Sequence, residues 1–251
     1  MIKRIATSRE FFLFLLFLVL FTIFAVTVEG FLNPYHLLRR TRYWVAAGMI
    51  AVPMTFIIAT AGIDLSVASI VALCGVVLGM AFNDLGLPLP VAMAAALIAG
   101  VLAGGLNGYV GSYIGVPPLV VTLATMVLYR GIAMGLSRAR SFGDFPGYFL
   151  AFHADALKLI SMPIKRQYIP VSLLVMLAIF LVGWVLMRRS WVGRYTECIG
   201  ENETAAQFAA IDVRWLKCML YTVCGLVCGV AALFHTSLYA SAKADTAAGM
   251  E

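Results

Sequence analysis

Gly62-Ile63-Asp64-Leu65-Ser66 places a single carboxylate between two runs that carry no charge, residues 43–63 and 65–83. About 20 apolar residues at 1.5 Å each cross the hydrocarbon core as one helix, so each run is long enough to span a membrane. The chain is therefore predicted to be a membrane protein, with Asp64 in a turn between two spans. A charge near the bilayer is costly unless it lies at an interface or in a protected, wet place, which makes Asp64 a candidate functional residue.

The composition of the whole chain supports a membrane protein. Hydrophobic residues make up 63% of its 251 residues and charged residues only 12%. A typical soluble domain has about 45–50% hydrophobic and about 25% charged residues. The core of a soluble protein cannot account for so large an excess of hydrophobic residues. The net charge of +6 fits basic residues that flank membrane spans, and no basic stripe with interleaved aromatic residues indicates nucleic-acid binding.

Uncharged runs divide the chain into seven predicted spans within one membrane domain, 1–251. The run 85–129 is too long for one helix and is divided at Gly115-Val116-Pro117-Pro118, because proline lacks an N–H donor and clashes with the preceding turn. Each span must be helical, since its backbone finds no water to bond in lipid. The expected fold is an all-α polytopic membrane protein with spans at about 11–28, 44–61, 66–82, 90–112, 119–137, 168–187 and 217–240.

Two connections between the predicted spans are long. Residues 138–168 are polar and of mixed composition. Within them, Phe149 to Leu159 are expected to form a short helix at the membrane interface. The other long connection is 188–216. Basic residues are shared almost equally between the two sides of the predicted topology, so the positive-inside bias does not orient the chain.

A short alanine-rich helix is predicted at 202–210, inside the second long connection. Gly200 is expected to end the segment that precedes it. Asn202 can cap the free N–H groups of its first turn, and Glu203 there is favoured by the helix dipole. The helix cannot span a membrane and is too short to be stable alone, so it is expected to pack against another surface.

Glycines recur every fourth residue on one face of the fourth predicted span, at Gly100, Gly104 and Gly108. Small residues at this spacing let two helices approach closely. One interpretation is general packing of the bundle. The other is that Asn107 and the small face line a solute path.

The chain has no motif for catalysis, metal binding or phosphate binding. It has no G-x-x-x-x-G-K-[ST] loop and no H-E-x-x-H pair, its three histidines are scattered, and its five cysteines are interpreted as small buried hydrophobic residues. No enzyme activity, metal or cofactor is therefore expected. Arg130, the one charge well within a span, either extends to an interface or lines the pathway. A carrier without ionisable relays in the bilayer must draw energy from a partner.

Three motifs, in this order along almost the whole chain, resemble those of the membrane permeases of ribose-type ABC sugar importers. They are Gly62-Ile63-Asp64-Leu65-Ser66-Val67-Ala68-Ser69, then Thr122-Leu123-Ala124-Thr125 with Tyr129-Arg130-Gly131, and then Gly193-Arg194-Tyr195 with Ile199-Gly200-Glu201-Asn202, Ala205-Ala206 and Ile211. Val52-Pro53-Met54-Thr55 suggests the rhamnose or autoinducer-2 subgroups. Ala68 and Ala124 depart from the family, which commonly has glycine there.

The resemblance implies a permease subunit without its own ATPase site, which imports a monosaccharide or an autoinducer-2-like sugar derivative across the bacterial inner membrane. Related permeases have about ten spans, so about three more are expected after Glu251. The N-terminus and 188–216 would be cytoplasmic, and 138–168 periplasmic. The implied partners are a separate ATP-binding subunit, a second permease subunit and a periplasmic sugar-binding protein.

Two sets of candidate residues follow from these motifs. The helix 202–210 would dock on the ATP-binding subunit, with the small side chain of Ala206 permitting close contact. A proton-coupled secondary transporter and a membrane scaffold without transport activity remain as alternatives. The coupling candidates are Gly200, Asn202, Glu203, Ala205 and Ala206, and the pathway or gating candidates are Asp64, Ser66, Asn107, Thr122, Thr125 and Arg130.

Overall fold

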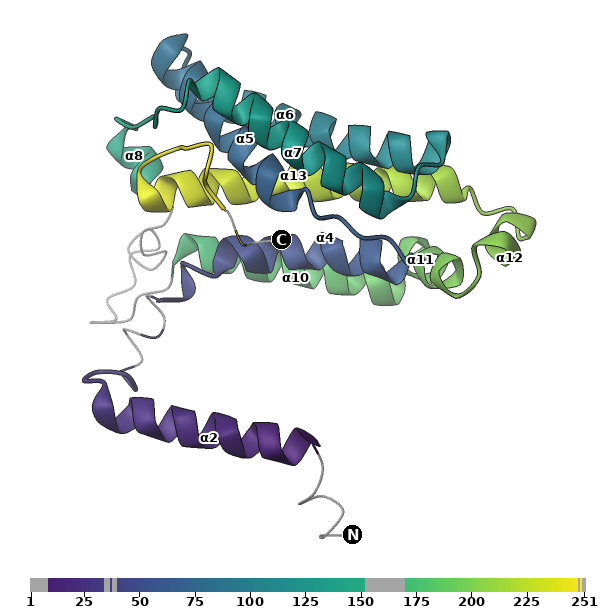
Figure 1. The fold of residues 1–251 in the computed structure, drawn as a ribbon, viewed down its shortest axis with the longest axis horizontal. Helices are drawn as coiled ribbons and strands as arrows, with labels where there is room; N and C mark the ends of the chain where they lie inside the picture. Colours follow the sequence, from purple (N-terminus) through teal and green to yellow (C-terminus); the bar gives the residue numbers. More distant parts are fainter. Residues whose placement is uncertain (1–8, 34–36, 38–39, 152–169, 248, 250–251) are drawn as a thin grey trace.

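The computed structural model describes residues 9–33, 37, 40–151, 170–247 and 249, and its regular elements are helices (Figure 1). In chain order they are α2 (Arg9–Thr27), α4 (Val45–Ala59), α5 (Val67–Gly79), the π-helical η1 (Met80–Asp84), α6 (Leu89–Tyr109), the π-helical η2 (Val110–Ile114), α7 (Pro118–Ser137), α8 (Gly147–Leu150), α10 (Val171–Arg189), α11 (Trp191–Glu201), α12 (Glu203–Phe208) and α13 (Val213–Tyr239).

Five helices of the described chain are long and apolar enough to cross a membrane, and each coincides with a predicted span. They are Val67–Asp84, Leu89–Ile114, Pro118–Ser137, Val171–Arg189 and Val213–Tyr239. The other two predicted spans form the shorter apolar helices Phe11–Thr27 and Val45–Ala59. The break predicted in the long uncharged run is also present. The backbone of Gly115 has a left-handed conformation, and the next helix, α7, begins at Pro118. The prediction of an all-α polytopic membrane protein is confirmed.

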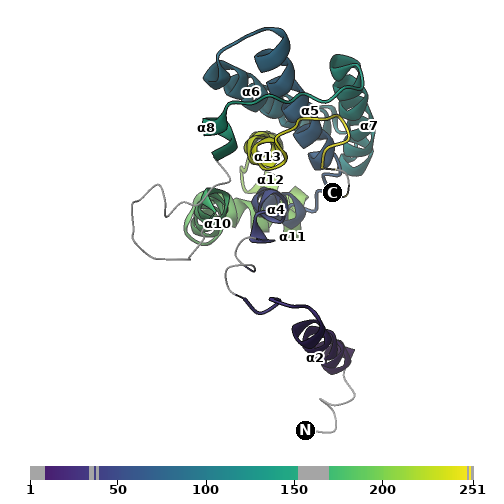
Figure 2. The same cartoon turned by 90° about the vertical axis from the view of Figure 1, so that its left-hand side faces the viewer.

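Helix α13 runs through the middle of the bundle (Figure 2). Helices α5, α6 and α7 lie on one side of it and α4 and α10 on the other, while α2 lies apart. Its most extensive contacts are with α6, followed by α4 and α5. Cys224 and Cys228 are fully buried there as free thiols, which agrees with their interpretation as small hydrophobic residues.

The glycine face of α6 packs directly on the backbone of α13. A Cβ atom on Gly104 would lie 2.2 Å from the carbonyl oxygen of Tyr221, and one on Gly100 would lie 2.3 Å from that of Gly225. Gly225 is equally constrained, since its own Cβ would lie 2.1 Å from the carbonyl oxygen of Gly100. At this separation no side chain fits between the two helices, so the glycines serve the packing of the bundle.

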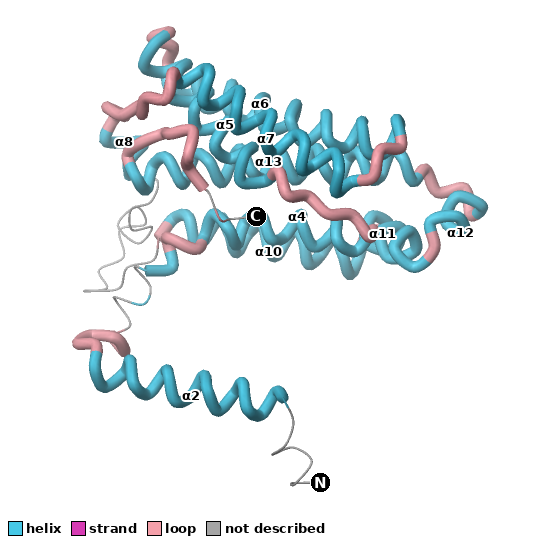
Figure 3. Tube along the Cα trace, viewed as in Figure 1, coloured by secondary structure: helices cyan, strands magenta, loops and turns pink. Residues whose placement is uncertain are grey.

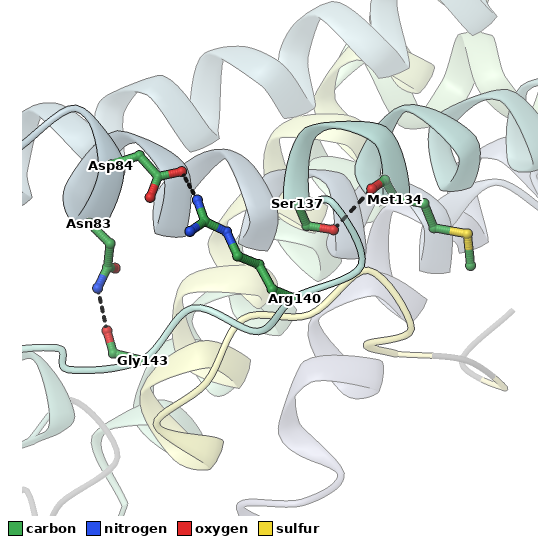
Figure 4. A network of polar contacts seen from close by, with 6 residues as sticks. All are labelled: Asn83, Asp84, Met134, Ser137, Arg140 and Gly143. Carbon is green, nitrogen blue, oxygen red and sulfur yellow. Dashed lines mark hydrogen bonds and ion pairs between the residues drawn. The ribbon is translucent and has the colours of Figure 1, made fainter.

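The connection that follows α7 is attached to the far end of α5 and to the segment after α13 (Figure 4). Arg140 pairs with Asp84, and Asn83 donates a hydrogen bond to the Gly143 carbonyl at 2.8 Å. Phe142 and Ala242 exchange two backbone hydrogen bonds. Of the interfacial helix predicted at Phe149 to Leu159, only the start is described, where α8 ends at Leu150; the rest lies outside the described residues.

We expect Gly104→Ala to destabilise the bundle. Alanine is about 1 kcal/mol better than glycine in a helix, but overpacking a close contact costs about 1–3 kcal/mol, and here the obstacle is a backbone carbonyl. Gly135→Ala on α7 is the matched control, because a Cβ there meets nothing within 4 Å. Thermal unfolding in detergent should show a lower midpoint for Gly104→Ala and an unchanged or higher one for Gly135→Ala. Equal midpoints would contradict the close approach of α6 and α13.

Candidate functional site

The segment that carries Asp64 runs inside the bundle. Helix α4 ends at Ala59, and the chain then runs back along the bundle as a loop until α5 begins beside the middle of α13 (Figure 3). Asp64 is 0% exposed. Asp64 therefore lies between two spans, as predicted, but in the protected interior of the bundle and not at an interface. The reason is that Tyr221 of α13 donates a hydrogen bond to the Ile63 carbonyl at 3.2 Å and holds the loop in the interior.

A continuous hydrogen-bond network surrounds the buried carboxylate. Ser66 donates to Asp64 Oδ1 through both its backbone N–H (2.9 Å) and its hydroxyl (2.6 Å). Asn107 Nδ2 of α6 donates to the Ser66 hydroxyl oxygen at 2.7 Å, and the Tyr129 hydroxyl of α7 donates to Asn107 Oδ1 at 3.0 Å. This network ties the start of α5 to α6 and α7. We call it the Asp64 network, and its members are Asp64, Ser66, Asn107 and Tyr129.

Sequence reasoning missed Tyr129 as a site residue. Tyr129 is 3% exposed, and a buried tyrosine hydroxyl normally needs a polar partner. Its position four residues after Thr125 in α7 is the signal that could have identified it, because that spacing keeps both side chains on one helix face.

Thr122 and Thr125 are buried on the same face of α7. Their hydroxyls donate to the carbonyls of Pro118 and Val121, each at 2.9 Å, so both side chains are bonded within their own helix. Thr122 also lies 3.4 Å from the Ile63 carbonyl. The contact of Thr122 with Ile63 packs α7 against the loop that carries Asp64. Asp64 Oδ2, in contrast, has no hydrogen-bond partner among the described residues.

Arg130 follows Tyr129 in α7 but makes its hydrogen bonds outside the Asp64 network. Its Nη1 donates to the carbonyls of Ala244 at 2.7 Å and Thr246 at 3.0 Å, in the segment that returns after α13. The half-buried side chain also lines a cavity of about 340 Å³. Of the six pathway candidates, the structure brings Asp64, Ser66 and Asn107 into one network, and it places Arg130 on a cavity.

The predicted short helix is present as α12, Glu203–Phe208, and its cap is confirmed. The Asn202 side chain accepts a hydrogen bond from the Ala205 N–H at 2.9 Å. Glu203 stands in the first turn, as predicted, and pairs with Lys217 of α13 at 2.6 Å. Helix α12 ends two residues earlier than expected.

Two of the coupling candidates have a different role in the structure. Ala206 is 4% exposed and belongs to the core of the chain, so it cannot face a partner. Gly200 does not end the preceding segment, because α11 continues to Glu201. A Cβ on Gly200 would lie 1.9 Å from the Ala59 carbonyl oxygen, so this glycine lets α11 pack against the end of α4.

The exposed side of α12 carries a residue that sequence reasoning did not select. Phe208 is 88% exposed, and Ala205 is exposed as well. An exposed phenylalanine at the end of a short helix is a candidate contact for another protein. The available signal was a single aromatic residue in an otherwise small and polar segment.

Residues 37–251 match the family model described as branched-chain amino acid transport system / permease component. Among curated relatives, an autoinducer 2 import system permease protein LsrD of Yersinia pseudotuberculosis serotype O:1b is 32% identical over 232 residues. Proteins of the same name from Yersinia enterocolitica and Yersinia pestis (strain Pestoides F) are 33% and 31% identical. Each match covers 90% of this chain and 67% of the relative.

No solved structure matches the chain. The family model covers most of the chain, including the Asp64 network, Arg130 and α12. The resemblance to the permeases of ribose-type ABC importers is thereby confirmed. The chain belongs to the family of transport-system permease components, and it is the membrane-spanning permease of an ABC importer.

Proposed function

We propose that the chain imports autoinducer 2 or a closely related small sugar derivative across the bacterial inner membrane, with energy from a separate ATP-binding subunit. The observation that carries the proposal is the match to autoinducer 2 import permeases over 90% of this chain. The family description names branched-chain amino acids instead. A family model covers many solutes, whereas the relatives match almost the whole chain at about one third identity, so we take their solute as the better guide.

In this proposal α12 is the docking element for the ATP-binding subunit, and α12 and the N-terminus lie on the cytoplasmic side. Phe208 would enter a pocket of that subunit, while burial of Ala206 and the Glu203–Lys217 ion pair hold α12 against its own chain. A second permease subunit and a periplasmic binding protein would complete the importer. ATP hydrolysis would take place on the partner, and this chain would supply the moving parts.

The packing of α11 suggests how movement of α12 would reach the membrane interior. Helix α11 leads into α12, and its Gly200 lies against Ala59, the last residue of α4. The next residues of the chain form the loop that carries Asp64. A shift of α11 would therefore press on one end of this loop, while the Asp64 network holds the other end. Two states of the ATP-binding subunit that contact α12 differently could in this way favour two arrangements of the bundle.

One feature of this permease is shared with proton-coupled carriers, the alternative that the sequence left open. Asp64 is an ionisable group buried in the bundle, and one of its oxygens has no partner among the described residues. Buried carboxylates serve as proton relays in carriers.

Uptake into proteoliposomes separates ATP-driven import from proton-driven import. The chain is assembled with its ATP-binding subunit and binding protein, and uptake of autoinducer 2, ribose and leucine is measured with ATP or with an imposed proton gradient. We expect ATP-dependent uptake of autoinducer 2 that the gradient does not drive, in the parent and in Asp64→Asn alike. Gradient-driven uptake that Asp64→Asn abolishes would establish the carrier instead, and leucine uptake would overturn the proposed solute.

Phe208→Ala should uncouple the importer without unfolding it. An anchoring aromatic residue contributes about 2 kcal/mol or more to an interface, so ATP-dependent uptake and co-purification of the ATP-binding subunit should fall at least about tenfold. Tyr148→Ala in α8 removes a similarly exposed aromatic ring at the opposite end of the bundle and should change neither measurement (Figure 1). Ala206→Arg should instead lower the unfolding temperature, because Ala206 is buried. Parent-level uptake by Phe208→Ala would remove α12 as the docking element.

Ser66→Ala should destabilise the bundle strongly. It removes one hydrogen bond to the buried carboxylate and leaves Asn107 Nδ2 without its acceptor, and each unsatisfied buried group costs about 1–3 kcal/mol. Ser172→Ala is the control, because Ser172 is equally buried and its hydroxyl has no partner among the described residues. Differential scanning calorimetry of both variants in detergent should show a lower midpoint of thermal unfolding for Ser66→Ala alone. Similar midpoints would mean that the Asp64 network does not hold the start of α5.

A further inference from the structure

Two adjoining cavities follow the outer side of α7. The inner one has a volume of about 340 Å³, and the outer one, of about 370 Å³, continues toward the end of α7 and shares Met134 with it. The inner cavity is lined by Ser69, Met126, Val127, Arg130, Gly131 and Met134. Charged and polar residues of the outer cavity are Arg140, Ser141, Lys243 and Asp245. Both volumes lie in the range of about 300–1,000 Å³ that is typical of small-molecule sites.

The guanidinium of Arg130 makes the inner cavity a poor site for lipid chains. Arg130 is the thirteenth of the 20 residues of α7, which places it near the middle of a membrane-spanning helix. A guanidinium facing hydrocarbon at that depth is strongly unfavourable, and charges there normally face protein or a water-filled cavity. Nη1 of Arg130 meets the carbonyls of Ala244 and Thr246, and we expect water in the cavity to solvate the rest of the guanidinium.

Two polar groups of this cavity keep hydrogen-bonding capacity that the described chain does not use. The two recorded bonds of Arg130 both use Nη1, which leaves the N–H groups of Nε and Nη2 available. Ser69 of α5 is fully buried at the inner end of the cavity, and its hydroxyl has no partner among the described residues. Because buried hydroxyls nearly always have a partner, we expect water or a bound solute to supply one that the described residues do not.

A third cavity provides a contrast. It has a volume of about 550 Å³ between α4, α10 and α13, and its lining residues are all apolar. It offers no side-chain donor to a hydroxyl group, so it suits an apolar occupant. Of the two membrane-depth cavities, the one at Arg130 therefore has the chemistry for a polar solute.

We propose that the cavity between Ser69 and Arg130 is a hydrated binding site for a small solute rich in hydroxyl groups, on the import route. Arg130 Nε and Nη2 donate to the oxygens of the solute, and the Ser69 hydroxyl bonds the part that reaches the inner end. By holding the carbonyls of Ala244 and Thr246, Arg130 also fixes the wall that leads to the outer cavity. This inference rests on the proposed function and adds a site and its chemistry to it.

Cysteine accessibility tests the site in the assembled importer in vesicles. Val127→Cys places a thiol in the inner cavity, and Leu102→Cys on α6 is the matched control, because both side chains are 67% exposed and only Val127 lines the cavity. A charged, membrane-impermeant methanethiosulfonate reacts with thiolates in water, and the parent chain gives the background from native cysteines. We expect Val127→Cys to react at least about tenfold faster than Leu102→Cys, and autoinducer 2 to slow that reaction.

The outcomes distinguish this inference from the proposed function. Equally slow reaction of both cysteines would overturn the hydrated cavity, whereas ATP-dependent uptake by the same vesicles would still support the permease function. Fast reaction that autoinducer 2 does not slow would overturn the solute site.

Ser69→Ala gives a second measurement, because it removes a hydroxyl without a described partner and should leave the unfolding temperature unchanged. The autoinducer 2 concentration that gives half protection of Val127→Cys should then rise about fivefold, the loss of one hydrogen bond. An unchanged concentration would remove Ser69 from the site.

Discussion

The arrangement of this bundle depends on how it accommodates a carboxylate in its interior. A buried carboxyl group without hydrogen bonds is strongly unfavourable, so the surroundings of Asp64 are strongly constrained. Two donors from Ser66 satisfy one oxygen, and Asn107 and Tyr129 extend the network to α6 and α7. The start of α5 is thereby fixed inside the bundle, where no turn of an ordinary helical hairpin would place it.

A second constraint comes from the contact between α6 and α13, where glycines bring two backbones together. This contact and the Asp64 network meet on α6, because Asn107 lies between Gly104 and Gly108. The result is a rigid centre with looser attachments. Helices α11 and α12 are attached to that centre less extensively than α6 is. Their contacts include Gly200 against Ala59, the ring contact of Trp191 with Trp215, the buried Ala206 and the Glu203–Lys217 ion pair. Such a design lets the ends move while the centre keeps its packing.

Local patterns in the sequence predicted local structure well. Each of the features that were predicted correctly depends on residues within one or two helical turns, or on the number of consecutive apolar residues. These features are the span positions, the break at Gly115 to Pro118, the glycine face of α6 and the cap at Asn202. Side-chain orientation within α12 was predicted less well, because Ala206 and Ala205 have the same chemistry and only packing against the core distinguishes them. Gly200 was interpreted as a helix end, but its role is a contact with a residue far away in the sequence.

The candidate site was harder to predict, since its bonds join distant segments. Asn107 reaches Ser66 over 41 residues, and Arg130 reaches Ala244 over 114. Charge spacing identified Asp64 and Arg130 as unusual, but it gave no partner for either. The hydroxyl of Ser69 had no distinguishing pattern at all, because its meaning depends on a missing partner and on the cavity in front of it.

We expect movement of α12 to reach the loop that carries Asp64 through the contact of Gly200 with Ala59. Hydrogen–deuterium exchange of the assembled importer, with and without a nucleotide that is not hydrolysed, tests it most directly. Exchange should change together in residues 191–208 and 60–66, while the backbone amides of α6 and α13 at their glycine contact stay protected. A change confined to 203–208, with unaltered exchange in 60–66, would contradict it.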